Sequence, residues 1–215
     1  MNILISGTSS GIGQATALKF LKEGHHVFGV DWNDSTIEDQ NYTHYKKDIR
    51  DTDLPKLDDI DIIVANAGVQ DEKDAVSINM NGTIHFVNNY LDSKALKSVL
   101  FVISSSARNG AEFPFYSASK GGLLAYSKHL ANSLAKQGIL VNSISPGGVV
   151  TPLNKHILEN KKLYDEVKNE TLLNKWATAE EIAEWIYFIT VINKSMTGED
   201  ILIDNGEILK SNFIW

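Results

Sequence analysis

Two side chains that can move a proton lie four residues apart, in the segment Tyr116-Ser-Ala-Ser-Lys120. Residues at this spacing are neighbours on one face of a helix. A free tyrosine, with a pKa of about 10, exchanges protons poorly at neutral pH, but a nearby cation stabilises the phenolate and lowers that pKa. Such a tyrosine can donate a proton to a carbonyl oxygen or accept one from an alcohol. The same spacing occurs by chance in many helices, so its weight depends on the rest of the sequence.

Three glycines follow the first apolar segment, in Gly7-Thr-Ser-Ser-Gly11-Ile-Gly13, immediately before a helical pattern. Without a Cβ, the chain turns sharply and brings backbone N–H groups close to a diphosphate, and the N-terminus of the helix adds partial positive charge. The pattern predicts a dinucleotide-binding loop. Its G-x3-G-x-G spacing differs from G-x-G-x-x-G, and the competing interpretation is a strand-to-helix turn without a ligand.

An acidic residue, Asp31, follows the second apolar segment. In a dinucleotide-binding fold a carboxylate at this place accepts hydrogen bonds from the adenosine ribose hydroxyls. It would repel a 2′-phosphate about 4 Å away by roughly 1 to 4 kcal/mol. The glycine loop carries Ser9 and Ser10 where an arginine would compensate. The sequence therefore favours NAD over NADP, with a solvated acid at the start of a turn as the alternative.

These groups need a scaffold, and the sequence alternates apolar segments with helical patterns. Apolar residues three or four apart predict helices at 12–23, 74–97, 117–137 and 179–192. Apolar, β-branched segments, which suit a parallel sheet covered on both faces, lie at 2–6, 26–30, 61–65, 98–104, 139–145 and 200–204. Because parallel neighbours need crossover helices, this order predicts an α/β doubly wound parallel sheet. No linker interrupts it, so we expect a single domain over 1–215.

Composition excludes several classes of function. The sequence has no cysteine, which rules out disulfides, a thiolate nucleophile and cysteine-ligated metals. A net charge of −7 gives no general attraction to nucleic acid or anionic lipid. The six histidines lack metal-ligand spacing, so we expect no metal site. With no signal-peptide pattern and no apolar run of about 18 residues, we expect a soluble, cytoplasmic protein that binds neither nucleic acid nor membranes.

Five motifs, in their order along the chain, resemble those of the short-chain dehydrogenase/reductase family. They are the glycine loop, Asn66-Ala67-Gly68, the serines at 104–106, Tyr116-x3-Lys120 and Pro146-Gly147. The resemblance covers nearly the whole chain, and includes the 3-oxoacyl-(acyl-carrier-protein) reductase-like and related NAD-dependent members. It implies a Rossmann-type fold with three α/β/α layers. It also implies hydride transfer between NAD(H) and a small carbonyl compound or secondary alcohol, with Tyr116 as general acid and base.

The resemblance implies catalytic roles for Asn79, Ser105, Tyr116 and Lys120. In the family an asparagine supports a water-mediated proton relay to the lysine, and Asn79 matches it better than Asn81. The lysine binds the nicotinamide ribose and lowers the pKa of the tyrosine. A serine after the fifth strand bonds the substrate oxygen, and the family pattern selects Ser105. The interval to Tyr116 is shorter than in many relatives, which leaves Ser104 and Ser106 as alternatives.

The cofactor-binding residues that the resemblance implies come from the ends of five strands and from the helix that carries Tyr116 and Lys120. Asp48 corresponds to an acid that touches the adenine amino group, and Val149 and Thr151 belong to a loop that reaches the nicotinamide carboxamide. The full set is Gly7, Ser9, Ser10, Gly11, Ile12, Gly13, Asp31, Asp48, Ile49, Asn66, Ala67, Gly68, Tyr116, Lys120, Pro146, Gly147, Val149 and Thr151. Trp32 is a further candidate, to cover the adenine. We interpret Trp176, Trp185 and Trp215 as packing or subunit-contact residues.

The chain departs from the family pattern by being short between Asp48 and Asn79, where part of the usual substrate wall is missing. The segment 152–178 is expected to form the substrate lid, but its mixed composition names no substrate. Oxoacyl thioesters, sugars, polyols and cyclic ketones all remain open. The family's tetramers imply a homotetramer or homodimer. The alternative function is a nucleotide-binding regulatory or assembly protein that has lost turnover, while an epimerase of the extended branch is disfavoured by the glycine spacing.

Overall fold

The structure, a computed structural model, describes residues 1–111 and 113–210. Its centre is a seven-stranded parallel sheet with the strand order β3-β2-β1-β4-β5-β6-β9. The strands are β1 Asn2–Ser6, β2 His26–Asp31, β3 Tyr42–Lys46, β4 Ile62–Ala65, β5 Ser98–Val102, β6 Leu140–Pro146 and β9 Asp200–Ile203. The order changes direction between β1 and β4, which confirms the predicted doubly wound, Rossmann-type sheet.

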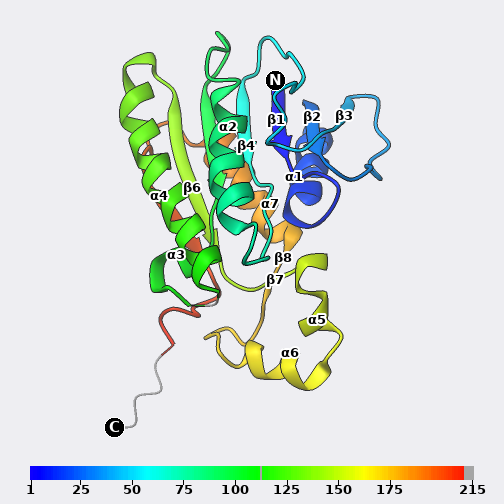
Figure 1. The fold of residues 1–215 in the computed structure, drawn as a ribbon, viewed down its shortest axis with the longest axis vertical. Coiled ribbons are helices and arrows are strands. Elements are labelled where there is room, and N and C mark those ends of the chain that lie inside the picture. The colour runs from blue at the N-terminus through cyan, green and yellow to red at the C-terminus, as the bar shows by residue number, and fades with distance from the viewer. Residues whose placement is uncertain (112, 211–215) are drawn as a thin grey trace.

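Helices cover both faces of the sheet, so the molecule has the three predicted layers (Figure 1). One face carries α1 (Gly11–Lys22) and α7 (Ala179–Tyr187), which share an apolar core with the strands through Phe20 and Ile182. The other carries α2 (Thr83–Asn88) and α4 (Pro114–Leu134), which contribute Phe86 and Leu123 to a second core. Burial on both faces explains why the central strands are continuous apolar runs rather than alternating patterns.

One predicted helix differs markedly from its predicted bounds. The helix predicted over 74–97 is a π-helical segment, η1 (Val76–Gly82), followed by α2, which ends at Asn88. Just past this end, the Asn89 side chain donates to the His85 carbonyl oxygen, and the Ser93 hydroxyl donates to the Ile60 carbonyl oxygen. Polar side chains of this kind compete with the helical hydrogen bonds of the backbone, and apolar periodicity does not report them.

The other predicted helices are close to the observed ones. The helix predicted over 117–137 starts earlier, at Pro114, because proline is favoured in the first turn. It continues through a short 3-10 turn, η2 (Ala135–Gln137), into Gly138, whose φ of 74° ends it. The helix predicted over 179–192 consists of α7 and a π-helical turn, η4 (Phe188–Ile192). The edge strand β3 is polar and half exposed, so it lacks the apolar signal of the other six.

The segment 152–178 lies beyond the carboxyl edge of the sheet (Figure 1). Its short helices are η3 (Pro152–Asn154), α5 (Lys155–Leu158) and α6 (Lys161–Lys168). The strand β8 (Ala177–Thr178) at its end pairs with β7 (Val149–Val150) at its start, which ties the segment to the loop after β6. None of the helices described is both long and apolar enough to cross a membrane.

Candidate active site

A cavity of about 590 Å³ lies at the carboxyl ends of the central strands, with the segment 152–178 along one side. This is the place where ligands bind in open α/β sheets. The predicted residues that line it are Gly7, Ser10, Gly11, Ile12, Asp31, Asp48, Ile49, Asn66, Ala67, Gly68, Tyr116, Lys120, Pro146, Gly147, Val149 and Thr151. Four predicted residues are not among the lining residues: Ser9, Gly13, Asn79 and Ser105.

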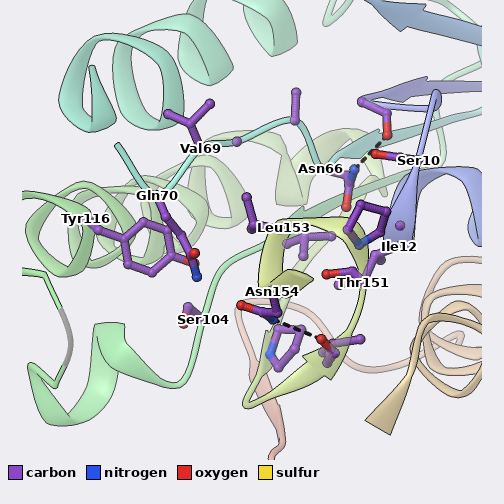
Figure 2. Close-up of a pocket in the computed structure, with 18 of the residues that line it drawn as sticks. Ser10, Ile12, Asn66, Val69, Gln70, Ser104, Tyr116, Thr151, Leu153 and Asn154 are labelled. Carbon is purple, nitrogen blue, oxygen red and sulfur yellow. Dashed lines mark hydrogen bonds between the residues drawn. The ribbon is translucent and has the colours of Figure 1, made fainter. Parts of the chain in front are cut away.

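The glycine loop connects β1 to α1 and is held against the loop after β4. The Asn66 side chain donates to the carbonyl oxygens of Ser6 and Gly7, at 3.1 and 3.2 Å. In return, the Ser6 hydroxyl accepts from the backbone N–H groups of Asn66 and Ala67. Figure 2 shows Asn66, Ser10 and Ile12 at this end of the cavity. The loop therefore presents bare backbone and a helix N-terminus to the cavity, which fits a diphosphate.

Close approach requires glycine at position 13, because a Cβ there would lie 1.9 Å from the Gly7 carbonyl oxygen and 2.5 Å from Nδ2 of Asn66. We expect Gly13→Ala to lower the free energy of unfolding by about 2 kcal/mol or more, since backbone must move. Gly121→Ala is the control: a Cβ at Gly121 meets nothing within 4 Å, and α4 is stabilised by about 1 kcal/mol. Urea unfolding measures both. Equal stability of the two variants would contradict the packing described.

Beside the glycine loop, Asp31 ends β2 and lines the cavity. Its carboxylate accepts from the backbone N–H groups of Ser9, at 3.0 Å, and Asn33, at 2.8 Å. The side chain thus forms the turn expected from the alternative interpretation and also ties that turn to the glycine loop. The neighbouring Trp32 lines the cavity and is half exposed. An acidic residue at the end of the second strand is the group that contacts the adenosine ribose in dinucleotide-binding folds.

Asp48 follows β3 on the same side of the cavity. The Arg50 guanidinium donates to both its carboxylate oxygens, at 3.0 and 2.7 Å, and the backbone N–H of Arg50 donates to it as well. These bonds hold the pKa of Asp48 below its usual range. The carboxylate is therefore ionised and fixed in place, with Ile49 buried beneath it.

The N-terminal turn of α4 presents Tyr116 and Lys120 to the middle of the cavity, both nearly buried. The Lys120 ammonium lies 5.8 Å from the centroid of the tyrosine ring and donates to the Val102 carbonyl oxygen at 3.0 Å. Burial lowers the pKa of Lys120 to about 8. The carboxylate of Glu72 accepts from the backbone N–H groups of Phe115 and Tyr116, and so stabilises the start of this helix.

Asn79 lies in η1, fully buried, behind the cavity wall. Its side chain exchanges two 2.8 Å hydrogen bonds with the backbone of Val69 and donates to the Ser119 hydroxyl. A Cβ on Gly68 would lie 3.1 Å from Oδ1 of Asn79 and 3.3 Å from Nζ of Lys120, so the amide and the ammonium flank this glycine. The other candidate of the sequence, Asn81, is exposed.

The three serines after β5 differ in their surroundings. Ser104 lines the cavity, and Figure 2 shows it near Tyr116. Its Oγ accepts from the hydroxyl of Ser106 at 2.9 Å. Ser105, the serine selected from the sequence, is buried outside the lining, and its backbone N–H donates to the Pro146 carbonyl oxygen. Ser104 is thus the one of the three that faces the cavity.

The loop after β6 completes the site opposite Tyr116. Figure 2 shows Thr151, Leu153 and Asn154 on this side. The Asn154 side chain donates to the Val149 carbonyl oxygen at 2.9 Å, which holds the loop in shape. Trp176 packs against Gly148, where a Cβ would lie 2.2 Å from the indole, and also lines the cavity. The packing role predicted for Trp176 therefore extends to the cavity wall; Trp215 lies outside the described residues.

Sequence reasoning missed three residues of this region. Ser119, between Tyr116 and Lys120, holds the amide of Asn79, and Glu72 caps the helix. Glu207, from the turn after β9, lines the cavity beside Gly147. The acidic turn Asp204-Asn-Gly-Glu207 was the available signal, but only the fold brings it to the cavity. Among the described residues, no group of three or more metal-ligating side chains is arranged to hold a metal ion.

The chain matches known proteins along its length. The family model described as enoyl-(acyl carrier protein) reductase matches residues 47–207. Glucose 1-dehydrogenase of Gluconobacter oxydans is 27% identical, over 98% of this chain and 93% of that protein. A 3-oxoacyl-(acyl-carrier-protein) reductase of Thermotoga maritima is 29% identical, over 96% and 97%. A solved 4-hydroxyisoleucine dehydrogenase complexed with NADH superposes with a TM-score of 0.86 at 28% identity, over 98% of this chain and 99% of that one.

These matches agree with the fold and with the order of the motifs around the cavity. They identify the protein as an oxidoreductase that acts on a small molecule, with a nicotinamide cofactor. The chain belongs to the short-chain dehydrogenase/reductase family.

Proposed function

We propose that the protein transfers hydride between NAD(H) and a small carbonyl compound or secondary alcohol, with Tyr116 as the general acid and base. The observation that carries the proposal is the grouping of Tyr116, Lys120 and Ser104 at the middle of one cavity whose end is the glycine loop. The nicotinamide, when bound, supplies or accepts the hydride. The chain's own residues hold that group, orient the substrate and move the proton.

Proton transfer is assigned to the Tyr116 hydroxyl, and Ser104 is proposed to bond the substrate oxygen in place of Ser105. In carbonyl reduction Tyr116 donates its proton to the oxygen as negative charge develops there; in alcohol oxidation it accepts the proton. The ammonium of Lys120 favours the phenolate, because opposite charges at short range lower the pKa of an acid. Asn79 positions this lysine through the backbone at Gly68 and Val69.

We further propose that NAD is the cofactor rather than NADP. Asp31 presents a carboxylate to the adenosine end of the cavity, and no arginine is among the described lining residues. A 2′-phosphate near this carboxylate would be repelled by about 1 to 4 kcal/mol. The residues proposed to hold the remainder of NAD are the glycine loop, Asp48 and Ile49, the Asn66–Gly68 segment, and the loop from Pro146 to Thr151.

The preference for NAD gives a direct prediction. We expect the wild type to bind NADH at least about ten-fold more tightly than NADPH, and Asp31→Ser to remove most of this difference. Asp34→Asn is the matched control, since Asp34 is exposed, belongs to the same turn and pairs with Lys46. Fluorescence titration with both cofactors measures the ratio. Tighter binding of NADPH by the wild type would refute the assignment of Asp31.

We propose the segment 152–178 as the substrate lid of a single domain. It contributes Leu153, His156, Val167 and Trp176, among others, to the cavity. The formation of homodimers or homotetramers stays a prediction from the family resemblance.

The proposed function is tested by titrating the protein with NADH and NAD, followed by a panel of small carbonyl compounds and secondary alcohols. Turnover of at least one class, with a nicotinamide absorbance change, supports the proposal. Tight NADH binding without turnover of any compound would contradict it.

A further inference from the structure

The cavity lining beside the loop after β6 carries acidic groups that the proposed chemistry does not use. Glu207 and Glu170 both belong to it, together with His156. The lysines among the described lining residues are Lys47 and Lys120, which lie near Asp48 and Tyr116. The segment 152–178 also contributes the apolar side chains of Trp176, Leu153 and Val167 to the lining. A substrate in this region therefore meets carboxylates rather than cations.

Hydrogen bonds hold the backbone of the turn after β9 that carries Glu207. The buried carboxylate of Asp204 accepts from the backbone N–H groups of Gly206 and Ile208, at 2.9 Å each. The backbone N–H of Glu207 donates to the Asp204 carbonyl oxygen at 3.1 Å. The segment 152–178 meets the same turn, since the backbone N–H of Leu173 donates to the Asn205 carbonyl oxygen. The backbone that carries Glu207 is thus held by its own turn and by the segment 152–178.

The carboxylate of Glu207 lies next to the loop that we assign to the nicotinamide. A Cβ on Gly147 would lie 2.7 Å from its Oε2, and the backbone N–H of Gly148 donates to the same oxygen at 3.4 Å. These contacts use one oxygen, on one side. Among the described residues, no lysine, arginine or histidine forms an ion pair with Glu207. The group therefore retains hydrogen-bonding capacity toward the cavity.

We infer that Glu207, with Glu170 at the rim, selects substrates that carry a hydroxyl group beside the reacting carbon and no carboxylate. A hydrogen bond from a hydroxyl to a carboxylate is charge-assisted and stronger than a neutral one. A substrate carboxylate in the same place would be repelled and would leave both acids without donors. This inference rests on the proposed function, because it concerns the substrate of that site.

The state of Glu207 favours a hydroxyl over an ammonium group as the partner. Burial raises the pKa of Glu207, and the negative charges of Asp204 and Glu170 raise it further. A hydroxyl can donate to the carboxylate and can equally accept from the carboxylic acid. An ammonium group bonds well with the ionised form alone, which burial disfavours.

The test compares alcohols that share a skeleton and differ in one group. The full-length protein with NAD is assayed on 1,2-propanediol, lactate, 2-butanol and 1-amino-2-propanol, and then on xylitol and xylonate. We expect kcat/KM for the diol to exceed that for lactate at least about ten-fold. We also expect it to exceed the values for 2-butanol and for the amino alcohol, with xylitol likewise preferred to xylonate.

Glu207→Gln removes the charge and keeps the shape, so we expect it to reduce the diol-to-lactate ratio about ten-fold, chiefly by improving lactate. Glu159→Gln is the matched control, because Glu159 is an exposed acid of the segment 152–178 that pairs with Lys155 and does not line the cavity; its ratio should equal that of the wild type. Calorimetric titration of xylitol and xylonate into the NAD complex of Tyr116→Phe gives the same comparison without turnover.

The outcomes separate the two proposals. Turnover of lactate or of the amino alcohol as efficient as that of the diol would overturn the inference and leave the oxidoreductase standing. An unchanged ratio in Glu207→Gln would do the same. If the wild type turns over a compound of the wider panel but none of these alcohols or the corresponding carbonyl compounds, the inference fails and the oxidoreductase stands. If it turns over no compound of the panel, the proposed function itself fails, and the inference fails with it.

Discussion

Replacing Tyr116 with phenylalanine is expected to lower kcat by about 10²- to 10⁴-fold, while the affinity for NADH stays within about two-fold. The hydroxyl is the one atom removed, and it is the group proposed to exchange the proton with the substrate oxygen. The ring, which lies 5.8 Å from the Lys120 ammonium, is retained. A loss confined to kcat would therefore report the missing proton donor rather than a disturbed cavity.

Tyr126→Phe is the matched control on the same helix. The Tyr126 hydroxyl donates to the Asn88 side chain at 2.7 Å, away from the cavity, so its loss should affect stability by about 1 kcal/mol and leave kcat unchanged. The measurement is steady-state turnover of the best substrate from the panel, with NADH titration of each variant. Retention of more than about a tenth of wild-type kcat by Tyr116→Phe would contradict the assigned role, because proton transfer is worth at least that much.

The sheet could be predicted because strands that are buried on both faces are continuous apolar segments in the sequence. The six apolar segments correspond to β1, β2, β4, β5, β6 and β9, and the helical periods between them give the crossovers. The strand β3 was not predicted, because it is a half-exposed edge strand and lacks an apolar pattern. The helix over 74–97 was predicted too long, because side chains of Asn89 and Ser93 bond backbone groups past its end. Apolar periodicity carries no information about such polar contacts.

The site was predictable where local spacing determines geometry. The glycine loop and the Tyr116–Lys120 pair each lie within a few consecutive residues, and both contribute to the cavity lining. The serine was harder, because a shift of one residue after a strand turns a side chain away, and Ser104 faces the cavity where Ser105 does not. Glu207 reaches the site only through the packing of β9 on β6, so no local pattern could place it.

The buried ammonium of Lys120 lowers the free energy of unfolding. Its ammonium is almost completely buried, and the described contacts give it one carbonyl oxygen as a hydrogen-bond partner within the protein, that of Val102. Burial lowers its pKa from 10.5 to about 8. An unfolded lysine keeps its proton up to about pH 10.5, so between pH 8 and 10.5 the unfolded chain binds more protons than the folded one. The free energy of unfolding should therefore rise with pH across that window.

Lys120→Met is accordingly expected to stabilise the protein without cofactor while it abolishes turnover. Below pH 8 the buried charge costs the wild type about 3 kcal/mol, and methionine removes this cost. Loss of the hydrogen bond to Val102 lowers the free energy of unfolding by about 1 kcal/mol, so the net gain at pH 7 is about 2 kcal/mol. At pH 9.5 the folded wild type has already released this proton, so more than half of the cost is gone and the gain should approach zero.

Urea unfolding at pH 7.0, 8.0 and 9.5 measures this gain, with Lys128→Met as the control, since Lys128 is exposed on the same helix. The control should differ from the wild type by less than about 0.5 kcal/mol at every pH. A destabilised Lys120→Met variant at pH 7 would show that the ammonium stabilises the folded state rather than destabilising it. A stabilised but inactive variant would mean that the charge is kept for the chemistry of Tyr116, because a positive charge beside the phenol is what makes proton exchange accessible near neutral pH.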